Sequence, residues 1–183
     1  TRANQSAWRT ALSLSILTSM ILMATPAQAG LLYWDALQAA SGTGSGGTGN
    51  WNTTSLFWYP GSGSSDQAWS TSGAANTAAF SGTAGLVTLT TAIGANRLIF
   101  NVTGYSLTNN TLTLNGTAPT IEVKTGTATI SSALAGTANL VVSGSGNLVL
   151  SGSNTYTKVT TLSGGSMTLD FSHSSVLNNI LNA

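Results

Sequence analysis

The sequence predicts an all-β fold in which short strands stack in repeated coils. Short segments between 85 and 170 alternate apolar side chains with Thr, Ser or Asn, as in LVTLT (86–90) and NLVL (147–150). Such alternation buries one face of a strand and leaves the other in solvent. Gly, Asn or Ser separates nearly every pair of segments, as expected of turns. No intervening segment has the length and period of a helix, which argues against alternating strands and helices.

Repetition favours a β-solenoid over a β-sandwich, the alternative that short, regularly spaced strands allow. ANLVVSGSG (138–146) is followed by GNLVLSGSN (146–154), and NNTLTLNGT (109–117) is a looser copy. Near-identical rungs suit a solenoid because each coil meets the same neighbours above and below. A sandwich usually needs different residues on each strand. At roughly 20–30 residues per coil, the segment 85–170 would hold about three or four coils.

The composition excludes several classes of function. Charged residues make up 5% of the 183 residues, against about 25% in a typical soluble domain. The formal net charge is +1, and no cluster of Lys or Arg occurs, which argues against a nucleic-acid-binding surface. The chain has no cysteine, so disulfides and thiolate zinc sites are excluded.

The N-terminal segment 1–29 has the three parts of a secretory signal peptide. Two arginines precede an apolar run at 11–24, and Ala27-Gln28-Ala29 forms an A-x-A cleavage site. The alternative is an uncleaved membrane anchor, but the apolar run is short for crossing a bilayer. We therefore expect Ala27 and Ala29 to direct cleavage and the mature chain to begin at Gly30.

Residues 30–84 are predicted to form an irregular N-terminal cap that is rich in Gly, Ser and aromatic residues. Four of the five tryptophans lie there: Trp34, Trp51, Trp58 and Trp69. Rings of this size favour burial in a small β unit. The alternative is an aromatic platform on which these tryptophans contact glycans. After the solenoid repeats at 85–170, residues 171–183 are expected to be a truncated continuation of the chain beyond the repeats.

The candidate chemical motifs favour no catalysis, cofactor or metal. GTGSGGTG (42–49) contains G-x-G-x-x-G twice, but a dinucleotide site needs a strand before it and a helix after it. A loop is the better interpretation. His173 is the single histidine, which makes a poor metal site or triad. The acids that follow the signal segment are isolated in sequence, whereas carbohydrate-active β-helices need clustered carboxylates: Asp35, Asp66, Glu122 and Asp170.

The chain resembles autotransporter-type passenger proteins, and more closely those with autotransporter-associated β-strand repeats. The likeness rests on the order YWD (33–35), GNW (49–51), NTAAF (76–80) and SGSGNLVLSGSNTYT (143–157), and it covers about residues 32–169. Its most specific part is SGSNTYT followed by GGSMTL (164–169). The resemblance implies a right-handed parallel β-helix that is exported across the inner membrane and displayed at the cell surface or released.

The chain departs from the family pattern at two places. Asn76 stands where the family often has Asp before the Thr-Ala-x-Phe step. Lys158-Val159 stands where the family usually has two glycines. Valine disfavours the positive φ that glycine adopts readily, so the second departure concerns the geometry of a turn.

These observations predict a secreted or cell-surface passenger segment that acts as a structural display or adhesion scaffold and is not an enzyme. The expected partners are surface glycans or the surfaces of host or neighbouring cells, and an outer-membrane translocator or anchor is expected beyond the C-terminus. The alternative function is a carbohydrate-binding or carbohydrate-active β-helix. An open terminal coil presents unpaired strand edges, so we also expect the chain from Gly30 onward to self-associate.

Overall fold

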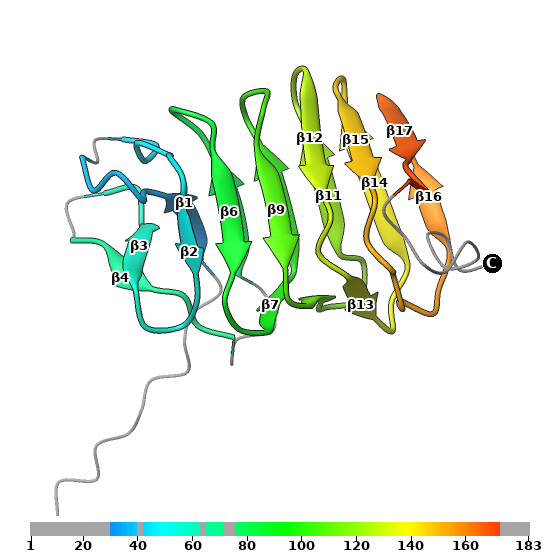
Figure 1. Cartoon of the computed structure of the whole chain (residues 1–183), viewed down its shortest axis with the longest axis horizontal. Helices are drawn as coiled ribbons and strands as arrows, with labels where there is room; N and C mark the ends of the chain where they lie inside the picture. The colour runs from blue at the N-terminus through cyan, green and yellow to red at the C-terminus, as the bar shows by residue number, and fades with distance from the viewer. Residues whose placement is uncertain (1–29, 40–41, 63–64, 72–75, 173–183) are drawn as a thin grey trace, which may run out of the picture.

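The computed structural model describes residues 30–39, 42–62, 65–71 and 76–172. Within these ranges the chain forms β-strands and no helix, and the strands stack into a parallel β-solenoid of about five turns (Figure 1). The predicted all-β solenoid is thereby confirmed. The alternative β-sandwich is wrong, because neighbouring coils pair in parallel along the three sheets.

The first sheet has eight strands in the order β16-β14-β11-β8-β5-β1-β3-β4. Parallel pairing runs from β1 to β16, while β3 and β4 add to the β1 edge in antiparallel orientation. The strands are β1 (Leu31–Trp34), β3 (Leu56–Tyr59), β4 (Gln67–Ala68), β5 (Thr77–Phe80), β8 (Arg97–Phe100), β11 (Thr120–Val123), β14 (Leu140–Gly144) and β16 (Thr160–Leu162).

Two further sheets pair equivalent strands of successive coils, as Figure 1 shows. The second sheet has six strands: β2 (Gly49–Trp51), β6 (Leu86–Leu89), β9 (Ser106–Asn109), β12 (Thr127–Ile130), β15 (Asn147–Leu150) and β17 (Ser166–Leu169). The short third sheet consists of β7 (Ile93–Ala95), β10 (Leu112–Leu114) and β13 (Leu134–Gly136).

Register within the first sheet gives the length of a coil. Thr77 pairs with Arg97, Arg97 with Thr120, and Thr120 with Val141. One coil therefore takes up about 20 residues, at the lower end of the range typical of such repeats. Parallel pairing begins with β1 on β5 and β2 on β6, so the stack extends into the segment 30–84. The antiparallel strands β3 and β4 cover the edge of the stack there.

Repetition in the sequence becomes ladders of like side chains inside the solenoid. One inward row of the first sheet runs along the whole stack through directly paired residues. Its members are Leu32, Ala78, Leu98, Ile121, Val142 and Leu162. All are buried except Leu162 in the last strand, which is 48% exposed. Each coil thus covers the apolar side chains of its neighbour, which is the arrangement that stabilises stacked repeats.

The SGSNTYT segment continues the third sheet without being a regular strand. Asn154 is buried, and its Oδ1 accepts a hydrogen bond from the backbone N–H of Leu134 at 2.9 Å. The N–H of Thr155 donates to the carbonyl of Leu134 at 2.7 Å, and that of Thr157 to the carbonyl of Gly136 at 3.1 Å. A side-chain amide therefore replaces one backbone acceptor in the ladder, so the buried N–H of Leu134 keeps a partner.

The turn at Lys158-Val159 does not need the glycine conformation. Among the described non-glycine residues, only Gln38 and Asn109 have positive φ. The carbonyl of Val159 accepts the N–H of Leu140 at 3.0 Å. The departure from the family pattern is therefore accommodated in the ladder.

A substitution at Gly144 can test how closely neighbouring coils pack. Its φ is +101°, and a Cβ atom there would clash with the carbonyl oxygen of Val123 in the neighbouring coil. Gly104 is a matched control because its φ is +94°, but a Cβ there would only reach ordinary contact with Ala84 at 3.4 Å. The left-handed region costs a non-glycine residue roughly 1–2 kcal/mol, and steric overpacking adds about 1–3 kcal/mol.

We predict that Gly144→Ala lowers the free energy of unfolding by about 3 kcal/mol or more, and that Gly104→Ala lowers it by only about 1–2 kcal/mol. Urea unfolding followed by circular dichroism measures both values. Equal losses in the two variants would mean that the close approach of neighbouring coils does not limit this turn.

Tyr105 is a buried polar side chain that joins two coils. Its hydroxyl donates toward the carbonyls of Ser81 at 2.6 Å and Thr83 at 2.9 Å. Burial raises the pKa of Tyr105 well above its ordinary value, and the nearby charge of Asp35 acts in the same direction. Because the folded pKa exceeds the unfolded one, the corresponding stability is complete below about pH 10 and is lost as the pH rises further.

We predict that Tyr105→Phe lowers the free energy of unfolding at neutral pH by about 1–2 kcal/mol, because buried carbonyl groups lose their donor. The variant should also lose less stability than the natural chain between pH 9 and 11. Burial raises the pKa of Tyr156 as well, so some alkaline loss should remain. Unfolding curves collected across this pH range measure both effects, and identical slopes would contradict the assignment.

Candidate functional site

The four tryptophans fill the core at the N-terminal end of the solenoid. Trp34, Trp51, Trp58 and Trp69 are each 0 or 1% exposed. Ring centroids lie 4.5 Å apart between Trp58 and Trp69 and 5.0 Å apart between Trp51 and Trp69. The indole N–H of Trp34 donates to Gly47, and that of Trp69 to Gly94. In this conformation the buried rings offer no free face to a sugar. Glycan contact by these tryptophans stays a prediction.

The glycine-rich loop at 42–49 forms the first corner of the stack. Its backbone exchanges hydrogen bonds with the equivalent corner of the next coil, through Gly47 to Thr83 at 2.7 Å and Thr83 to Ser45 at 3.0 Å. Asp35 is wholly buried beneath it, and one carboxylate oxygen accepts hydrogen bonds from the backbone N–H and the hydroxyl of Ser45. The loop leads into β2, and its contacts are those of a structural corner.

The structure brings Asp66 within range of the charge of Asp35. Burial raises the pKa of Asp66, and the charge of Asp35 raises it further. Glu122 forms an ion pair with Arg97 at 2.6 Å on the outer face of the first sheet. Across the described ranges, no group of three or more His, Asp or Glu is placed to hold a metal ion. His173 lies outside the described residues.

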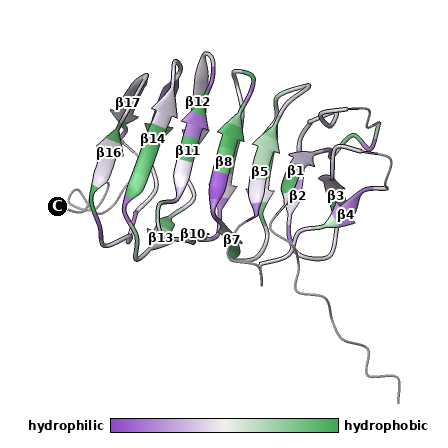
Figure 2. Cartoon of the chain, turned by 180° about the vertical axis from the view of Figure 1, so that it is seen from behind, coloured by the Kyte–Doolittle hydropathy of each residue, from purple (hydrophilic) through white to green (hydrophobic). Residues whose placement is uncertain are grey.

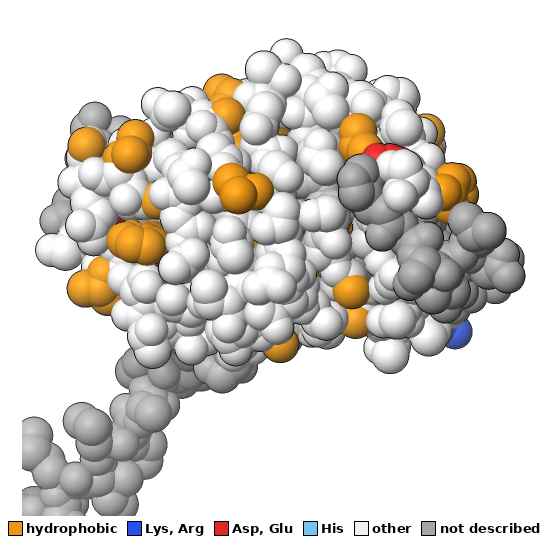
Figure 3. Space-filling view, in the orientation of Figure 1, with side chains coloured by type: hydrophobic (Ala, Val, Ile, Leu, Met, Phe, Trp, Pro, Cys, Tyr) orange, Lys and Arg blue, Asp and Glu red, His pale blue; other side chains and the backbone are white. Residues whose placement is uncertain are grey.

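The outer face of the second sheet is polar and largely uncharged. Ser106, Thr129, Val149 and Thr168 lie in one register row across successive coils. Asn147 accepts hydrogen bonds from Ser166 at 2.9 Å and from Thr168 at 3.2 Å. Figure 3 shows this side of the molecule with few charged side chains. The face therefore resembles a solvated ladder of polar side chains, and its reactive groups do not cluster at one point.

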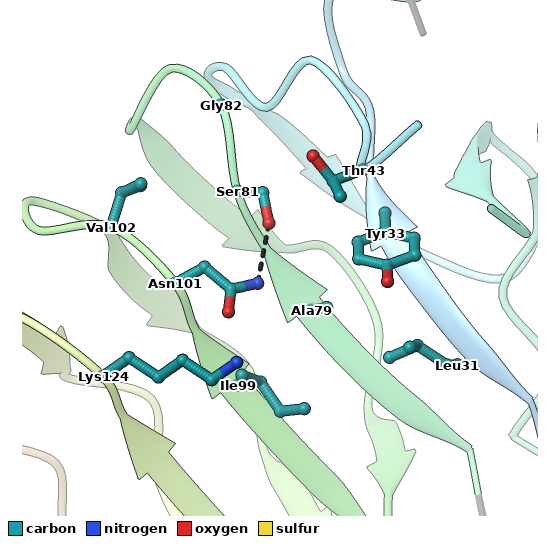
Figure 4. A pocket seen from close by; sticks show the side chains of 10 residues that line it. All are labelled: Leu31, Tyr33, Thr43, Ala79, Ser81, Gly82, Ile99, Asn101, Val102 and Lys124. Carbon is teal, nitrogen blue, oxygen red and sulfur yellow. Dashed lines mark hydrogen bonds between the residues drawn. The ribbon is translucent and has the colours of Figure 1, made fainter. Parts of the chain in front are cut away.

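A groove on the outer face of the first sheet is the candidate ligand site. Figure 2 shows this sheet from its outer side, and Figure 4 shows the groove from close by. The groove has a volume of about 400 Å³. Its apolar lining comes from Leu31, Tyr33, Ala79, Ile99 and Val102. Its polar lining comes from Thr43, Ser81, Asn101 and Lys124.

The register of the coils explains the hollow. Tyr33 pairs with Ala79 and Ala79 with Ile99, and all three side chains alternate with inward-facing neighbours. Because side chains in one row stand side by side on the sheet, the short side chain of Ala79 lies between two larger neighbours, which leave it only 1% exposed. The low point of the row is therefore set by one small residue.

One polar side chain from each of three successive coils lines the corner beside the hollow. Ser81, Asn101 and Lys124 each follow directly after β5, β8 or β11, whose ends are in register. The Nδ2 group of Asn101 donates to Oγ of Ser81 at 2.7 Å. Lys124 extends across the groove toward Ile99 (Figure 4). Considering the described residues only, Lys124 has no ion-pair partner, whereas Arg97 and Glu122 neutralise each other.

The sequence did not indicate this groove because its lining comes from separate coils. No local motif joins Tyr33, Ala79, Asn101 and Lys124, which come from different coils of the stack. Aligning the coils by the spacing of their paired residues would have placed Ala79 between Tyr33 and Ile99. The groove could therefore be found only from the register between coils, which prediction of the individual strands does not give.

Comparison with known proteins identifies a related adhesin. The chain is 42% identical over 168 residues to the Adhesin BmaC autotransporter of Brucella suis biovar 1 (strain 1330). The alignment covers 90% of this chain but only 5% of that protein, so the chain corresponds to a small part of its relative. No family model and no solved structure matches the chain.

The relationship agrees with the fold and has a consequence for location. Homology to an autotransporter adhesin implies export to the cell surface or outer membrane. The part of the chain that the structure describes contains no helix long and apolar enough to cross a membrane. The resemblance to autotransporter passengers is confirmed: the chain is a parallel β-solenoid homologous to a segment of an autotransporter adhesin.

Proposed function

We propose that the chain is a non-enzymatic display and adhesion segment of an exported passenger. The observation that carries the proposal is the uninterrupted stack of coils, in which inward rows form one core and outward rows form long, ordered faces. Such quasi-one-dimensional stacks present extended binding surfaces. The adhesin relative supports the same role.

The arrangement of carboxylates supports a role without catalysis. Glycoside hydrolysis uses two carboxyl groups about 5–10 Å apart on either side of the scissile bond. Here Glu122 is paired with Arg97, Asp35 is buried against Ser45, and Asp170 accepts hydrogen bonds from Ser172. Asp66 differs from these three acids, because its buried Oδ1 has no hydrogen-bond partner and it lies within range of the charge of Asp35. No described Asp or Glu lines the groove of the first sheet.

Export is proposed to begin with removal of the signal segment. Ala27 and Ala29 lie outside the described residues, so cleavage after Ala29 rests on the sequence. Gly30 directly precedes β1, and its N–H donates to Oδ1 of Asn76 at 3.3 Å. Cleavage at this point would leave the first strand intact at the start of the mature chain. A translocator or anchor beyond the C-terminus is part of the same proposal.

We predict that beads coated with the exported chain adhere to epithelial cells several-fold more than beads coated with albumin. Ordered outward faces are the proposed cause, so beads coated with the heat-unfolded chain should lose the excess. Microscopy of washed monolayers counts the bound beads. N-terminal sequencing should first show that the exported material begins at Gly30. Adhesion no higher than that of albumin would contradict the adhesive role.

We also predict that the exported chain self-associates through its last coil. Leu162 and Val159 are 48% and 61% exposed at this end, and β16 and β17 are the outermost strands of their sheets. Leu162→Glu should weaken association because it places a charge at the exposed edge of the last described coil. Leu56→Glu, at an exposed leucine of β3, is the matched control. Light scattering over a wide concentration range measures the mass, and a constant monomer would contradict this proposal.

A further inference from the structure

We propose that the groove on the outer face of the first sheet binds a saccharide that carries a carboxylate. The proposal rests on the adhesive function proposed above, for which it names the chemical class of the ligand. At about 400 Å³, the groove lies within the range of about 300–1,000 Å³ that small-molecule sites occupy. Its apolar lining with a few convergent polar groups is also the usual composition of such sites.

Charge is the first argument for a carboxylate. Lys124 is the lysine of the groove, and it has no ion-pair partner within the described residues. Arg97 and Glu122 on the same face form a pair with each other at 2.6 Å, so the groove keeps one net positive charge. A lysine ammonium and a carboxylate form a charge-assisted hydrogen bond, which is stronger than a neutral one.

A fixed amide is the second argument, because it suits the hydroxyl groups of a sugar. Asn101 donates one Nδ2 hydrogen to Oγ of Ser81 at 2.7 Å, and Ser81 is itself buried. Figure 4 shows Oδ1 of Asn101 on the side away from Ser81, facing the groove. This oxygen can accept a hydroxyl proton and the second Nδ2 hydrogen can be donated, so one residue can meet both needs of a hydroxyl group.

The apolar part of the groove is the third argument. Ala79 and Ile99 lie between Tyr33 and Lys124 (Figure 4) but are only 1% and 9% exposed, so the exposed apolar surface of the groove comes from Leu31, Tyr33 and Val102. Gly61 lies beside the ring of Tyr33, since a Cβ atom built on Gly61 would lie 3.2 Å from its Cε2 atom. The C–H face of a sugar ring is apolar and gains free energy when it leaves water against such a surface. A ring that is already positioned loses little entropy on binding.

Other macromolecules fit the groove less well. β5 and β8 beneath it are paired on both sides, so no free strand edge is present for an extended peptide to pair with. One lysine does not provide the row of positive charges that a nucleic-acid backbone requires. An acidic saccharide needs only the single cation, the amide and the apolar lining that the groove contains.

The test measures binding of defined sugars to the purified exported chain at low salt. The probes are sialyllactose, a disaccharide containing glucuronic acid, and neutral lactose as the control. We expect both acidic sugars, or one of them, to bind at least fivefold more tightly than lactose, and affinity should fall with added salt because the interaction is ionic. A preference between the two acidic probes identifies the source of the carboxylate. Titration calorimetry or nuclear magnetic resonance measures the affinities.

Matched variants locate the site. Lys124→Gln and Tyr33→Ala should each weaken binding of the acidic sugar at least fivefold. Lys158→Gln removes the same charge from another exposed lysine and should leave the affinity unchanged. Gly61→Ala crowds the ring of Tyr33 and also strains a backbone with a φ of +88°, so it should weaken binding with Lys124 intact. Circular dichroism should show the native β signal in every variant that is compared.

Three results would overturn the inference: lactose binding as tightly as the acidic sugars, an unchanged affinity in Lys124→Gln, or tighter binding of an acidic peptide. Loss of binding in a folded Trp58→Phe variant, with groove variants unaffected, would also overturn it in favour of the tryptophans.

The bead assay separates this proposal from the adhesive function. Adhesion that persists in Lys124→Gln contradicts the groove alone, whereas sugar binding without adhesion contradicts the adhesive role.

Discussion

The in-register stacking of coils is the constraint on which the rest of the structure depends. Each parallel strand of the first sheet is paired with the equivalent strand of the next coil, so a side chain meets the same neighbours over several coils. Inward positions must therefore stay apolar, and a single polar or oversized residue would disturb two interfaces at once. The inward row that includes Leu98 and Ile121 obeys this rule. The stacked rings of Phe80 and Phe100, with centroids 4.9 Å apart, obey it with aromatic residues.

Because each coil is covered by its neighbours, the two ends of the described stack differ in how their core and strand edges are covered. At the N-terminal end of the described chain, β3 and β4 continue the sheet from β1 in antiparallel orientation, and tryptophan rings fill the core there. At the other end of the described chain, Leu162 lies in an inward row on β16, beyond which no described strand pairs, and is 48% exposed. Aromatic burial and strand pairing thus close one end, while the other end has the exposed apolar edge that a further coil or another copy would cover.

The sequence predicts the parts of the fold that depend on local pattern. Alternation in NLVL and its neighbours identifies the strands, and near-identical copies identify the solenoid, because both follow from what one coil needs. The role of Asn154 as an acceptor for Leu134 depends on the coil before it, which periodicity does not specify. The groove depends on which residues three coils place side by side. Ala79 is an ordinary small residue within NTAAF, and only its pairing with Tyr33 and Ile99 places it in the lining of the groove.

Because the chain has few charges, each charged side chain has a large influence on the electrostatic potential of its surroundings. In a chain with 5% charged residues, most of the surface contributes little electrostatic potential, so an unpaired ammonium such as that of Lys124 is not masked by opposite charges nearby. Arg97 and Glu122 cancel each other on the same face, and Lys124 therefore sets the sign of the potential over the groove. A highly charged surface would screen such a group with its own neighbours and would attract many anions weakly. A nearly neutral scaffold instead favours a small anion at the few places where an unpaired cation lines a groove, as Lys124 does, provided that apolar contact with Tyr33 and Leu31 supplies the remaining affinity.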